Sequence, residues 1–198
     1  MTTEKQPNHP GSIATNTARL VENKVNRDVP ARFHGLEPAK AFPEGDGFFF
    51  SGKPGSGKTH KAVQLYHRFM LDRGRNCCYF FRAEDLIHAL REDQDEKKRP
   101  SYKNKEGATV IAPPLIERLL RARLLVIDDF SDDGLTEWAI AKFNHIINSR
   151  YDNLLPTIIT TNLTMEDLEG VSKRMSSRMK DFIRVEIKGE AHEQSQKA

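Results

Sequence analysis

Five short apolar runs alternate with five amphipathic stretches through the middle of the chain. The runs are rich in aromatic and β-branched residues, so we expect them to form strands, several of them buried on both faces. They span 47–51, 77–81, 124–127, 157–161 and 182–187. The amphipathic stretches carry apolar residues at helical spacing over 58–72, 83–91, 113–121, 135–151 and 171–179. Strands that alternate with helices predict an α/β fold, with a parallel sheet covered by helices on both faces.

The two ends of the chain lack this pattern. Residues 1–28 are polar, so we expect a flexible N-terminal arm in which 18–26 could form a short helix. Residues 189–198 are also polar and predict a disordered tail. A single domain is therefore expected over 29–188, with a charged loop inside it over 92–107.

Composition narrows the class of protein only modestly. The chain has 198 residues, 37% hydrophobic and 30% charged, as in an ordinary soluble protein. No apolar run approaches the ~20 residues of a membrane span, so we expect no membrane partner. The only cysteines, Cys77 and Cys78, are adjacent and poorly placed to bridge each other, which favours a reduced, cytoplasmic protein. A net charge of +3 permits contact with nucleic acid without indicating it.

A glycine-rich segment between the first expected strand and the first expected helix matches the P-loop pattern G-x-x-x-x-G-K-[ST] in full. It consists of Gly52, Lys53, Pro54, Gly55, Ser56, Gly57, Lys58 and Thr59. Such a loop turns several backbone N–H groups toward phosphate oxygens, and the following helix adds the positive end of its dipole. We therefore predict an ATP site in which Lys58 bridges the β- and γ-phosphates and Thr59 ligates Mg²⁺. The alternative, a glycine-rich turn without a ligand, is disfavoured by the strand–loop–helix context.

Two acids follow the strand at 124–127. In open α/β sheets ligands bind at the carboxyl ends of the strands, so Asp128 is expected to hold Mg²⁺ through its water shell. Asp129 is expected to orient or deprotonate the attacking water. Because aspartate is one methylene shorter than glutamate, this base could be slow or could act through an extra water. An acidic turn after a core strand is the alternative.

Two further segments hold candidate catalytic residues. Asn162 ends the strand at 157–161 and could bond the γ-phosphate or the attacking water, although a lone asparagine is more often a turn former. Arg174 and Arg178 share a helix face, and an arginine presented to a neighbour's nucleotide could act as an arginine finger. From these residues alone, a solvated basic face is the better interpretation of the arginine pair.

The charged loop also holds candidate contacts to DNA. Basic residues with an interleaved aromatic suit a single strand, through phosphate contacts and one stacked base. The candidates are Lys97, Lys98, Arg99, Tyr102, Lys103 and Lys105. Acidic residues precede them, so a solvated loop whose charges screen each other is the competing interpretation, and the residues alone favour it.

Together these segments resemble AAA+ ATPases and, more narrowly, the DnaC/IstB-like group of helicase loaders and transposition helpers. The resemblance covers 29–187 and rests on motifs that occur in the family's order, with further support from the segment 29–33. These motifs are GKPGSGKT, LLVIDDF, TIITTN and RMSSRM. In such proteins the asparagine corresponding to Asn162 is a sensor, and the arginine corresponding to Arg178 acts on the ATP of a neighbouring subunit.

The resemblance implies a five-stranded sheet of order 5-1-4-3-2 in a three-layer sandwich, with no helical lid domain and with ATP bound between self-associated subunits. It places the charged loop toward a central channel. It implies an ATP-hydrolysing DNA replication protein that loads a replicative helicase and engages single-stranded DNA. Alternatives are a transposition helper that acts on duplex DNA, or a nucleotide-sensing adaptor with little turnover. The short segment before residue 29 leaves the helicase partner in doubt, because loaders usually grip the helicase with a separate N-terminal domain.

Overall fold

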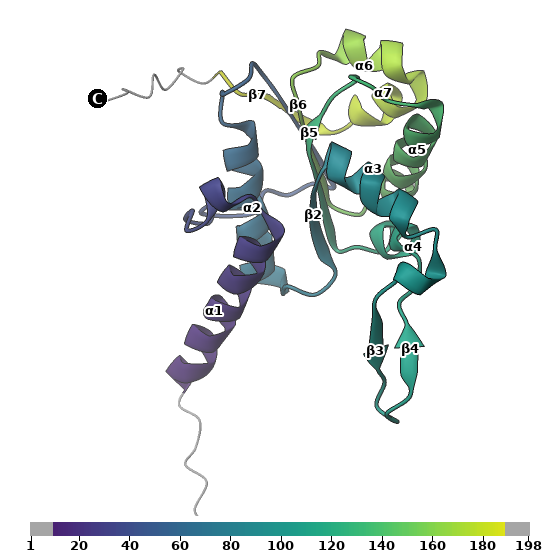
Figure 1. The fold of residues 1–198 in the computed structure, drawn as a ribbon. Helices are drawn as coiled ribbons and strands as arrows, with labels where there is room; N and C mark the ends of the chain where they lie inside the picture. The colour runs from purple at the N-terminus through teal and green to yellow at the C-terminus, as the bar shows by residue number, and fades with distance from the viewer. Residues whose placement is uncertain (1–9, 189–198) are drawn as a thin grey trace, which may run out of the picture.

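Five parallel strands form the central sheet of the protein. The computed structural model describes the backbone of residues 10–188 and the side chains of 16–188. The strands are β1 (Gly47–Ser51), β2 (Cys78–Arg82), β5 (Leu124–Phe130), β6 (Thr157–Thr161) and β7 (Ile183–Glu186). They lie in the order β2-β5-β6-β1-β7, and each pair is parallel (Figure 1). If these five strands are numbered 1 to 5 along the chain, the order read from β7 to β2 is 5-1-4-3-2, which confirms the prediction.

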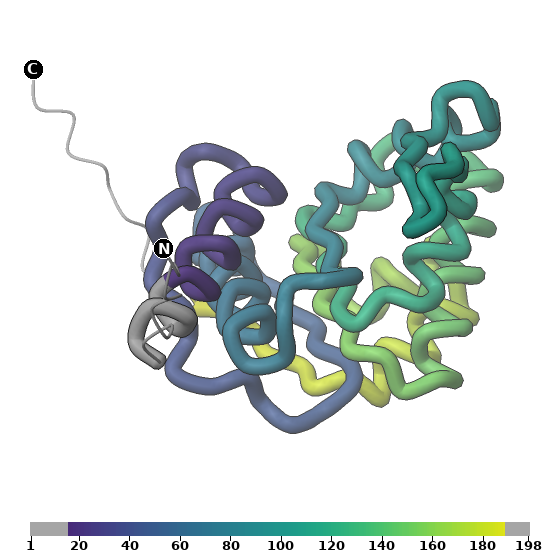
Figure 2. The backbone as a smooth tube through the Cα atoms, turned by 90° about the horizontal axis from the view of Figure 1, so that it is seen from below, coloured from purple at the N-terminus to yellow at the C-terminus, as the bar shows by residue number. Residues whose placement is uncertain are grey.

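Helices cover both faces of the sheet, as the alternating pattern predicts. One face carries α1 (Pro10–Asp28) and α2 (Lys58–Arg73), and a short 3₁₀ helix (Ala31–Phe33) links α1 to the region before β1. The other face carries α3 (Ala83–Glu92), α4 (Leu115–Leu120), α5 (Glu137–Asp152), α6 (Met165–Val171) and α7 (Lys173–Met179). Viewed from below, the two groups lie on opposite sides of the strands (Figure 2).

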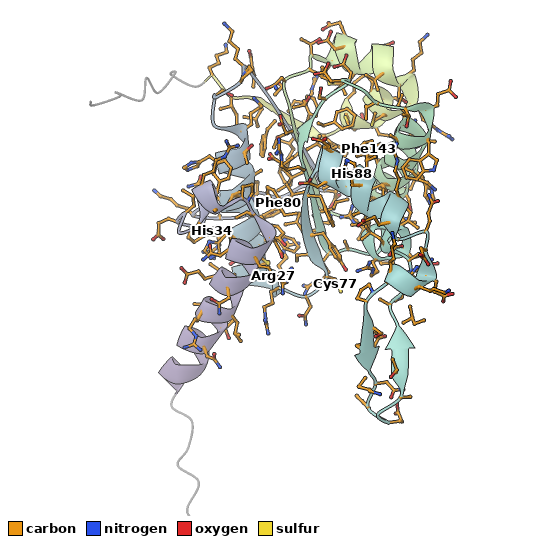
Figure 3. All side chains as sticks on the ribbon, in the orientation of Figure 1. Arg27, His34, Cys77, Phe80, His88 and Phe143 are labelled. Carbon is orange, nitrogen blue, oxygen red and sulfur yellow. The ribbon has the colours of Figure 1, made fainter. Side chains whose placement is uncertain are left out.

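Each face has its own hydrophobic core. Alternate residues of β1 point to opposite sides, so Phe48 and Phe50 join the core under α2, whereas Phe49 joins the core under α5. Phe80 and Phe143 mark these two cores on either side of the sheet (Figure 3). Within residues 10–188 no helix follows β7, so the described chain is a three-layer sandwich without a helical lid.

The short helix expected over 18–26 of the N-terminal arm is present and is longer than expected, because residues 10–28 are helical. They form the 19-residue helix α1, whose Val21 and Val25 are buried against the α2 side of the core. Its last residue, Asp28, accepts hydrogen bonds from Lys24 Nζ at 2.5 Å and from the Tyr66 hydroxyl at 2.6 Å. The buried residues of α1 recur only once per turn, and the rest of the helix is polar. This apolar stripe is too narrow for the sequence to show a clear amphipathic helix over its full length. Residues 1–9 of the arm and the tail 189–198 lie outside the described residues.

The charged loop expected over 92–107 is also more ordered than predicted. It contains a 3₁₀ helix (Glu96–Lys98) and an antiparallel hairpin of β3 (Ser101–Lys103) and β4 (Thr109–Ile111). Asp93 anchors the base of this hairpin, because its carboxylate accepts from the Leu115 amide at 2.5 Å and pairs with Arg99 and Arg118. The hairpin projects from the end of the molecule opposite the loop between β1 and α2 (Figure 1).

A buried arginine joins three elements behind the sheet. Arg150 of α5 is fully buried and donates to Thr157 Oγ1 at 2.9 Å, at the start of β6. Its other N–H groups donate to three backbone carbonyls at 2.6–2.8 Å. These carbonyls belong to Leu119, Ala122 and Pro156. Burial lowers the pKa of Arg150 to about 10, a value at which the guanidinium is still charged at neutral pH. The buried charge therefore depends on these oxygens for its hydrogen bonds.

Candidate functional site

The glycine-rich segment forms the turn between β1 and α2. Gly57 has φ 97° and is the N-cap of α2, so the helix begins at Lys58 with its N-terminus facing the loop. Gly52 has φ 146°, and a Cβ there would lie 2.5 Å from the Ile187 carbonyl oxygen. Only glycine fits at Gly52 without moving backbone, which explains why the loop can pass so close to the end of β7.

Lys58 lies folded into this loop. Its side chain is buried, and Nζ donates to the carbonyl oxygens of Gly52 and Lys53, both at 2.8 Å. An ammonium has three donors, so one remains for an anionic oxygen. Burial lowers the pKa of Lys58, while the nearby charges of Asp129 and Asp128 oppose that shift. The two carboxylates therefore help to keep the lysine charged.

Asp128 is the buried acid of the site. It is 2% exposed and accepts hydrogen bonds from Thr59 Oγ1 at 3.1 Å and from Thr160 Oγ1 at 2.6 Å. Burial raises the pKa of Asp128, and the two hydroxyl hydrogen bonds counter part of that rise. Thr59 and Asp128, which the sequence suggested as the metal pair, thus present adjacent oxygens of the kind that Mg²⁺ prefers.

Asp129 reaches the same cleft because the strand is irregular there. Consecutive strand side chains ordinarily point to opposite faces. At Asp129, however, φ is 56°, and the pairing of β5 with β6 shifts between Ile127 and Phe130. The side chain is about half exposed and accepts from Arg82 Nη2 at 3.3 Å. Both acids therefore line one cleft, with a cation held beside the outer one.

The cleft has a volume of about 910 Å³. It is lined by Pro30, Arg32, Phe33, Pro54, Gly55, Gly57, Lys58, Thr59, His60, Arg82, Asp128, Asp129 and Asn162. One part of the wall is apolar, from Pro30, Phe33 and Pro54, and the rest is polar or charged. The hydroxyl of Ser56 is buried without a hydrogen-bond partner among the described residues, and open space surrounds Gly55 and Gly57. These features fit a triphosphate with Mg²⁺ in the polar part and a base against the apolar wall.

The candidate catalytic residues separate into two groups. Asn162 is exposed and lines the cleft with Lys58 and Asp129, as expected from its place after β6. Arg178 and Arg174 do not line it. Arg178 lies on α7 beside α5, and Arg174 borders a separate hollow of about 500 Å³ along α5. Neither arginine is in place to act on a nucleotide in the cleft of its own chain.

The candidate DNA contacts lie on the hairpin segment, which comprises the 3₁₀ helix Glu96–Lys98 and the hairpin after it, at the end of the molecule opposite the loop between β1 and α2 (Figure 1). Lys97, Lys98 and Lys105 are exposed, and Tyr102 is 54% exposed on β3. Arg99 differs, because its Nε donates to the Asp93 carbonyl at 2.9 Å and the guanidinium pairs with the Asp93 carboxylate. The structure thus gives Arg99 a role in holding the hairpin base.

Several residues in or next to the cleft were not predicted from the sequence. Arg82 is a polar residue at the carboxyl end of β2, so the rule that selected Asp128 and Asn162 could have found it. Thr160 is one of several β-branched residues in a buried strand, and nothing local distinguishes it. Pro30 and Phe33 precede the first strand and reach the cleft only through the tertiary fold.

This sheet order, with a P-loop after β1 and two acids near the carboxyl end of β5, defines an AAA+ type P-loop domain. The chain belongs to the family of IstB-like ATP binding proteins, which matches residues 44–191.

The similarity extends to named proteins. The replicative helicase loader DnaC of Escherichia coli K12 is 28% identical over 138 residues, which are 70% of this chain and 50% of that relative. The chain therefore spans about half the length of this curated relative. A crystal structure of the DnaC helicase loader is 26% identical with a TM-score of 0.56, covering 91% of this chain and 93% of that one.

Other neighbours share the fold alone. The replication initiator DnaA, bound to AMPPCP and single-stranded DNA, is 23% identical with a TM-score of 0.57, covering 90% of this chain and 50% of that one. Among the described helices, none has the length and apolar character needed to cross a membrane.

Proposed function

We propose that the protein is an ATP-hydrolysing switch that loads a replicative helicase during DNA replication. The observation that carries the proposal is the convergence of Lys58, Thr59, Asp128 and Asp129 on one cleft. The type of function is supported by the family and by the similarity to DnaC, which is named as a replicative helicase loader. Because the chain matches half of that relative, the helicase remains a partner that experiment must establish.

Each residue of the cleft has a distinct role in this proposal. When bound, ATP would supply the phosphoanhydride bond that is hydrolysed, and Mg²⁺ would neutralise negative charge on its phosphates. Lys58 offers its third N–H to phosphate oxygens, while Thr59 and Asp128 hold the metal side. Asp129 would orient or deprotonate the attacking water, and Asn162, which lines the same cleft, would bond that water or the γ-phosphate.

The proposal includes self-association with ATP between subunits. Arg178 and Arg174 lie away from the cleft of their own chain, which suits arginines that act on a neighbour's nucleotide. A head-to-tail contact of this kind repeats around a ring or along a helical filament. Hydrolysis would then depend on assembly, because the cation that stabilises the transition state comes from the next subunit.

Single-stranded DNA is the proposed nucleic-acid partner, held by the hairpin. Lys97, Lys98, Lys103 and Lys105 offer phosphate contacts, and the exposed ring of Tyr102 offers a stacking surface. Arg99 contributes by keeping the hairpin base attached to Asp93.

Two other functions use the same cleft. A transposition helper that tracks duplex DNA is favoured by the IstB-like family itself. A nucleotide-sensing adaptor with little turnover is favoured by the ion pair of Asp129 with Arg82 at 3.3 Å, which engages the expected base. Identification of the protein retained by the tagged chain in ATP and Mg²⁺ distinguishes the helicase loader from the transposition helper. The rate of phosphate release distinguishes both from the nucleotide-sensing adaptor.

The decisive experiment begins with calorimetry of ATP binding. Lys58→Ala should abolish binding, whereas Lys61→Ala, which removes an exposed lysine one turn further along α2, should leave it unchanged. The same pair of variants is then compared in ATP-dependent retention of a replicative helicase. ATP uptake by Lys58→Ala equal to that of the unaltered protein would remove the basis of the proposal, and retention of a transposase alone would favour the second candidate.

A further inference from the structure

Arg178 is held by an aromatic ring. Its Cζ lies 5.0 Å from the centroid of the Tyr151 ring, at the end of α5. The Tyr151 hydroxyl donates to Asp181 Oδ2 at 2.5 Å, in the turn between α7 and β7. Asp181 thereby fixes the ring on which the guanidinium lies.

The carboxylates of this region are not paired with Arg178. Other arginines of the domain meet an acid directly, as Arg82 meets Asp129 and Arg68 meets Asp72. Among the described side chains, Arg178 forms no ion pair, and its Nε is buried without a hydrogen-bond partner. Asp181 is occupied by the Tyr151 hydroxyl, and this hydrogen bond raises the pKa of Tyr151.

This arrangement suits an arginine that must bind an anion brought by another molecule. A salt bridge would use the N–H groups of the guanidinium and neutralise its charge. A ring face instead attracts the cation electrostatically while the N–H donors at the edge stay free. The ring thus restricts the side chain without using the groups that bind phosphate.

We propose that Tyr151 is a positioning residue that holds the Arg178 guanidinium ready for the triphosphate bound by a neighbouring copy of this chain. The inference rests on the proposed function, in which Arg178 acts between subunits, and it adds the group that places that arginine. Asp181 acts on Arg178 only indirectly, because it fixes the tyrosine ring on which the guanidinium lies.

The test measures ATP binding and phosphate release by variants, alone and mixed 1:1 with Lys58→Ala. Tyr151→Leu fills the space without a ring, and Tyr151→Phe keeps the ring but loses the bond to Asp181. We expect Tyr151→Leu to bind ATP normally and to release phosphate about three- to thirtyfold more slowly, the range of a cation–π contact. Tyr151→Phe should lose less activity than Tyr151→Leu.

Mixing distinguishes positioning from folding. Lys58→Ala subunits bind no ATP but keep Tyr151 and Arg178, so they can serve the nucleotide of a Tyr151→Leu neighbour. Random assembly gives such an interface about one time in four, so the mixture should show about a quarter of the unaltered activity per subunit plus a quarter of the variant's own activity, against half of the variant's own activity if no rescue occurs. A merely structural defect within the Tyr151→Leu subunit would not be repaired by a neighbour.

The control variant Arg178→Ala distinguishes failure of the Tyr151 proposal from failure of the trans-acting arginine itself. If Lys58→Ala rescues Arg178→Ala but Tyr151→Leu is either fully active alone or not rescued, the inference about Tyr151 is overturned and the trans-acting arginine stands. If Arg178→Ala is not rescued either, Arg178 does not act across the interface, and the proposed function loses this arginine from its assembly step as well.

Discussion

Thr160 connects the two acids of the cleft through one hydroxyl. Its Oγ1 donates to Asp128 Oδ1 at 2.6 Å and accepts from the Asp129 backbone N–H at 2.9 Å. The same side chain therefore orients the metal-side carboxylate and stabilises the irregular backbone that turns Asp129 into the cleft.

Replacing Thr160 by valine keeps the shape and removes both hydrogen bonds. We expect a loss of about 1–2 kcal/mol in the free energy of unfolding, because two buried groups lose a partner. We also expect weaker Mg²⁺-dependent ATP binding, by about tenfold. The matched control is Thr161→Val in the same strand, whose hydroxyl donates to the Phe130 carbonyl at 2.6 Å. It should lower stability similarly without changing the Mg²⁺ dependence, and equal effects of the two variants on metal binding would contradict the assignment.

The buried carboxylate makes stability depend on pH. Because burial raises the pKa of Asp128, the folded protein binds its proton at a higher pH than the unfolded chain does. The contribution of this group to the free energy of unfolding therefore falls as the pH rises from the ordinary aspartate range through the raised pKa. Asp128→Asn should flatten that part of the profile and, without nucleotide, raise the Tm at neutral pH by about 2–4 °C.

Thermal melting of Asp128→Asn between pH 4.5 and 8 checks this prediction, with the exposed Asp132→Asn as control. The same substitution should abolish the Mg²⁺ contribution to ATP binding, since the metal side loses its charge. A variant that melts below the unaltered protein at neutral pH would show that the carboxylate is stabilising as it stands.

Arg82 restrains the expected catalytic base. The pair of Arg82 with Asp129 is about half exposed, and such pairs are worth up to about 1 kcal/mol. Arg82→Gln should therefore raise basal phosphate release by up to about fivefold, because Asp129 is released from its ion pair. Phosphate release by Arg82→Gln, Asp129→Asn and the double variant is the measurement. If Asp129→Asn leaves turnover unchanged, the base is another group; if Arg82→Gln lowers turnover, the arginine assists hydrolysis.

The buried Arg150 should matter for stability and not for chemistry. Arg150→Met leaves the hydroxyl of Thr157 and three carbonyls without their donor, and we expect a loss of about 3–5 kcal/mol. Arg150→Lys keeps a charge but not the planar fork and should lose less. The exposed Arg121→Met, at the C-cap of α4, should change stability by less than about 0.5 kcal/mol. Urea denaturation measures all three, and a small effect of Arg150→Met would mean that water replaces the lost donors.

The structure allows a more specific prediction of DNA binding by the hairpin segment. Alanine at all four hairpin lysines should weaken binding of single-stranded DNA and reduce its salt slope by about 0.7 per lost phosphate contact, with ATP affinity unchanged. These lysines are Lys97, Lys98, Lys103 and Lys105. Tyr102→Ala should weaken binding about five- to hundredfold with the same slope, because a stacked base is lost.

Two controls accompany the hairpin variants. A variant that removes the same charge elsewhere, with alanine at Lys40, Lys61, Arg75 and Arg121, should bind DNA more strongly than the hairpin variant. Arg99→Ala should weaken DNA binding only together with the stability of the hairpin, because Arg99 contacts Asp93. Equal DNA affinity of the two four-site variants would mean that net charge, and not the hairpin, binds DNA.

The residues that the structure brings together as the sequence predicted carry their signal locally. The P-loop and the two acids near the carboxyl end of β5 combine a residue pattern with a place at a strand end, and the structure brings Thr59 and Asp128 within 3.1 Å. Thr160 and Arg82 matter because of which strands are neighbours, information that one strand does not contain. Helix α6 was not predicted, although Thr164 and Asp167 have the spacing of a capping box and form one at its start.

Helix α3 begins and ends at residues already described. Its N-cap is Arg82, which pairs with Asp129 in the cleft, and its C-cap is Asp93, which anchors the hairpin. Ten helical residues span about 15 Å, so one helix connects the residue beside the cleft acid to the residue that anchors the hairpin. In the proposed function, a ligand that displaces the hairpin would therefore act on the same helix whose first cap residue pairs with Asp129, and the proposed nucleic-acid and nucleotide sites share one segment of chain.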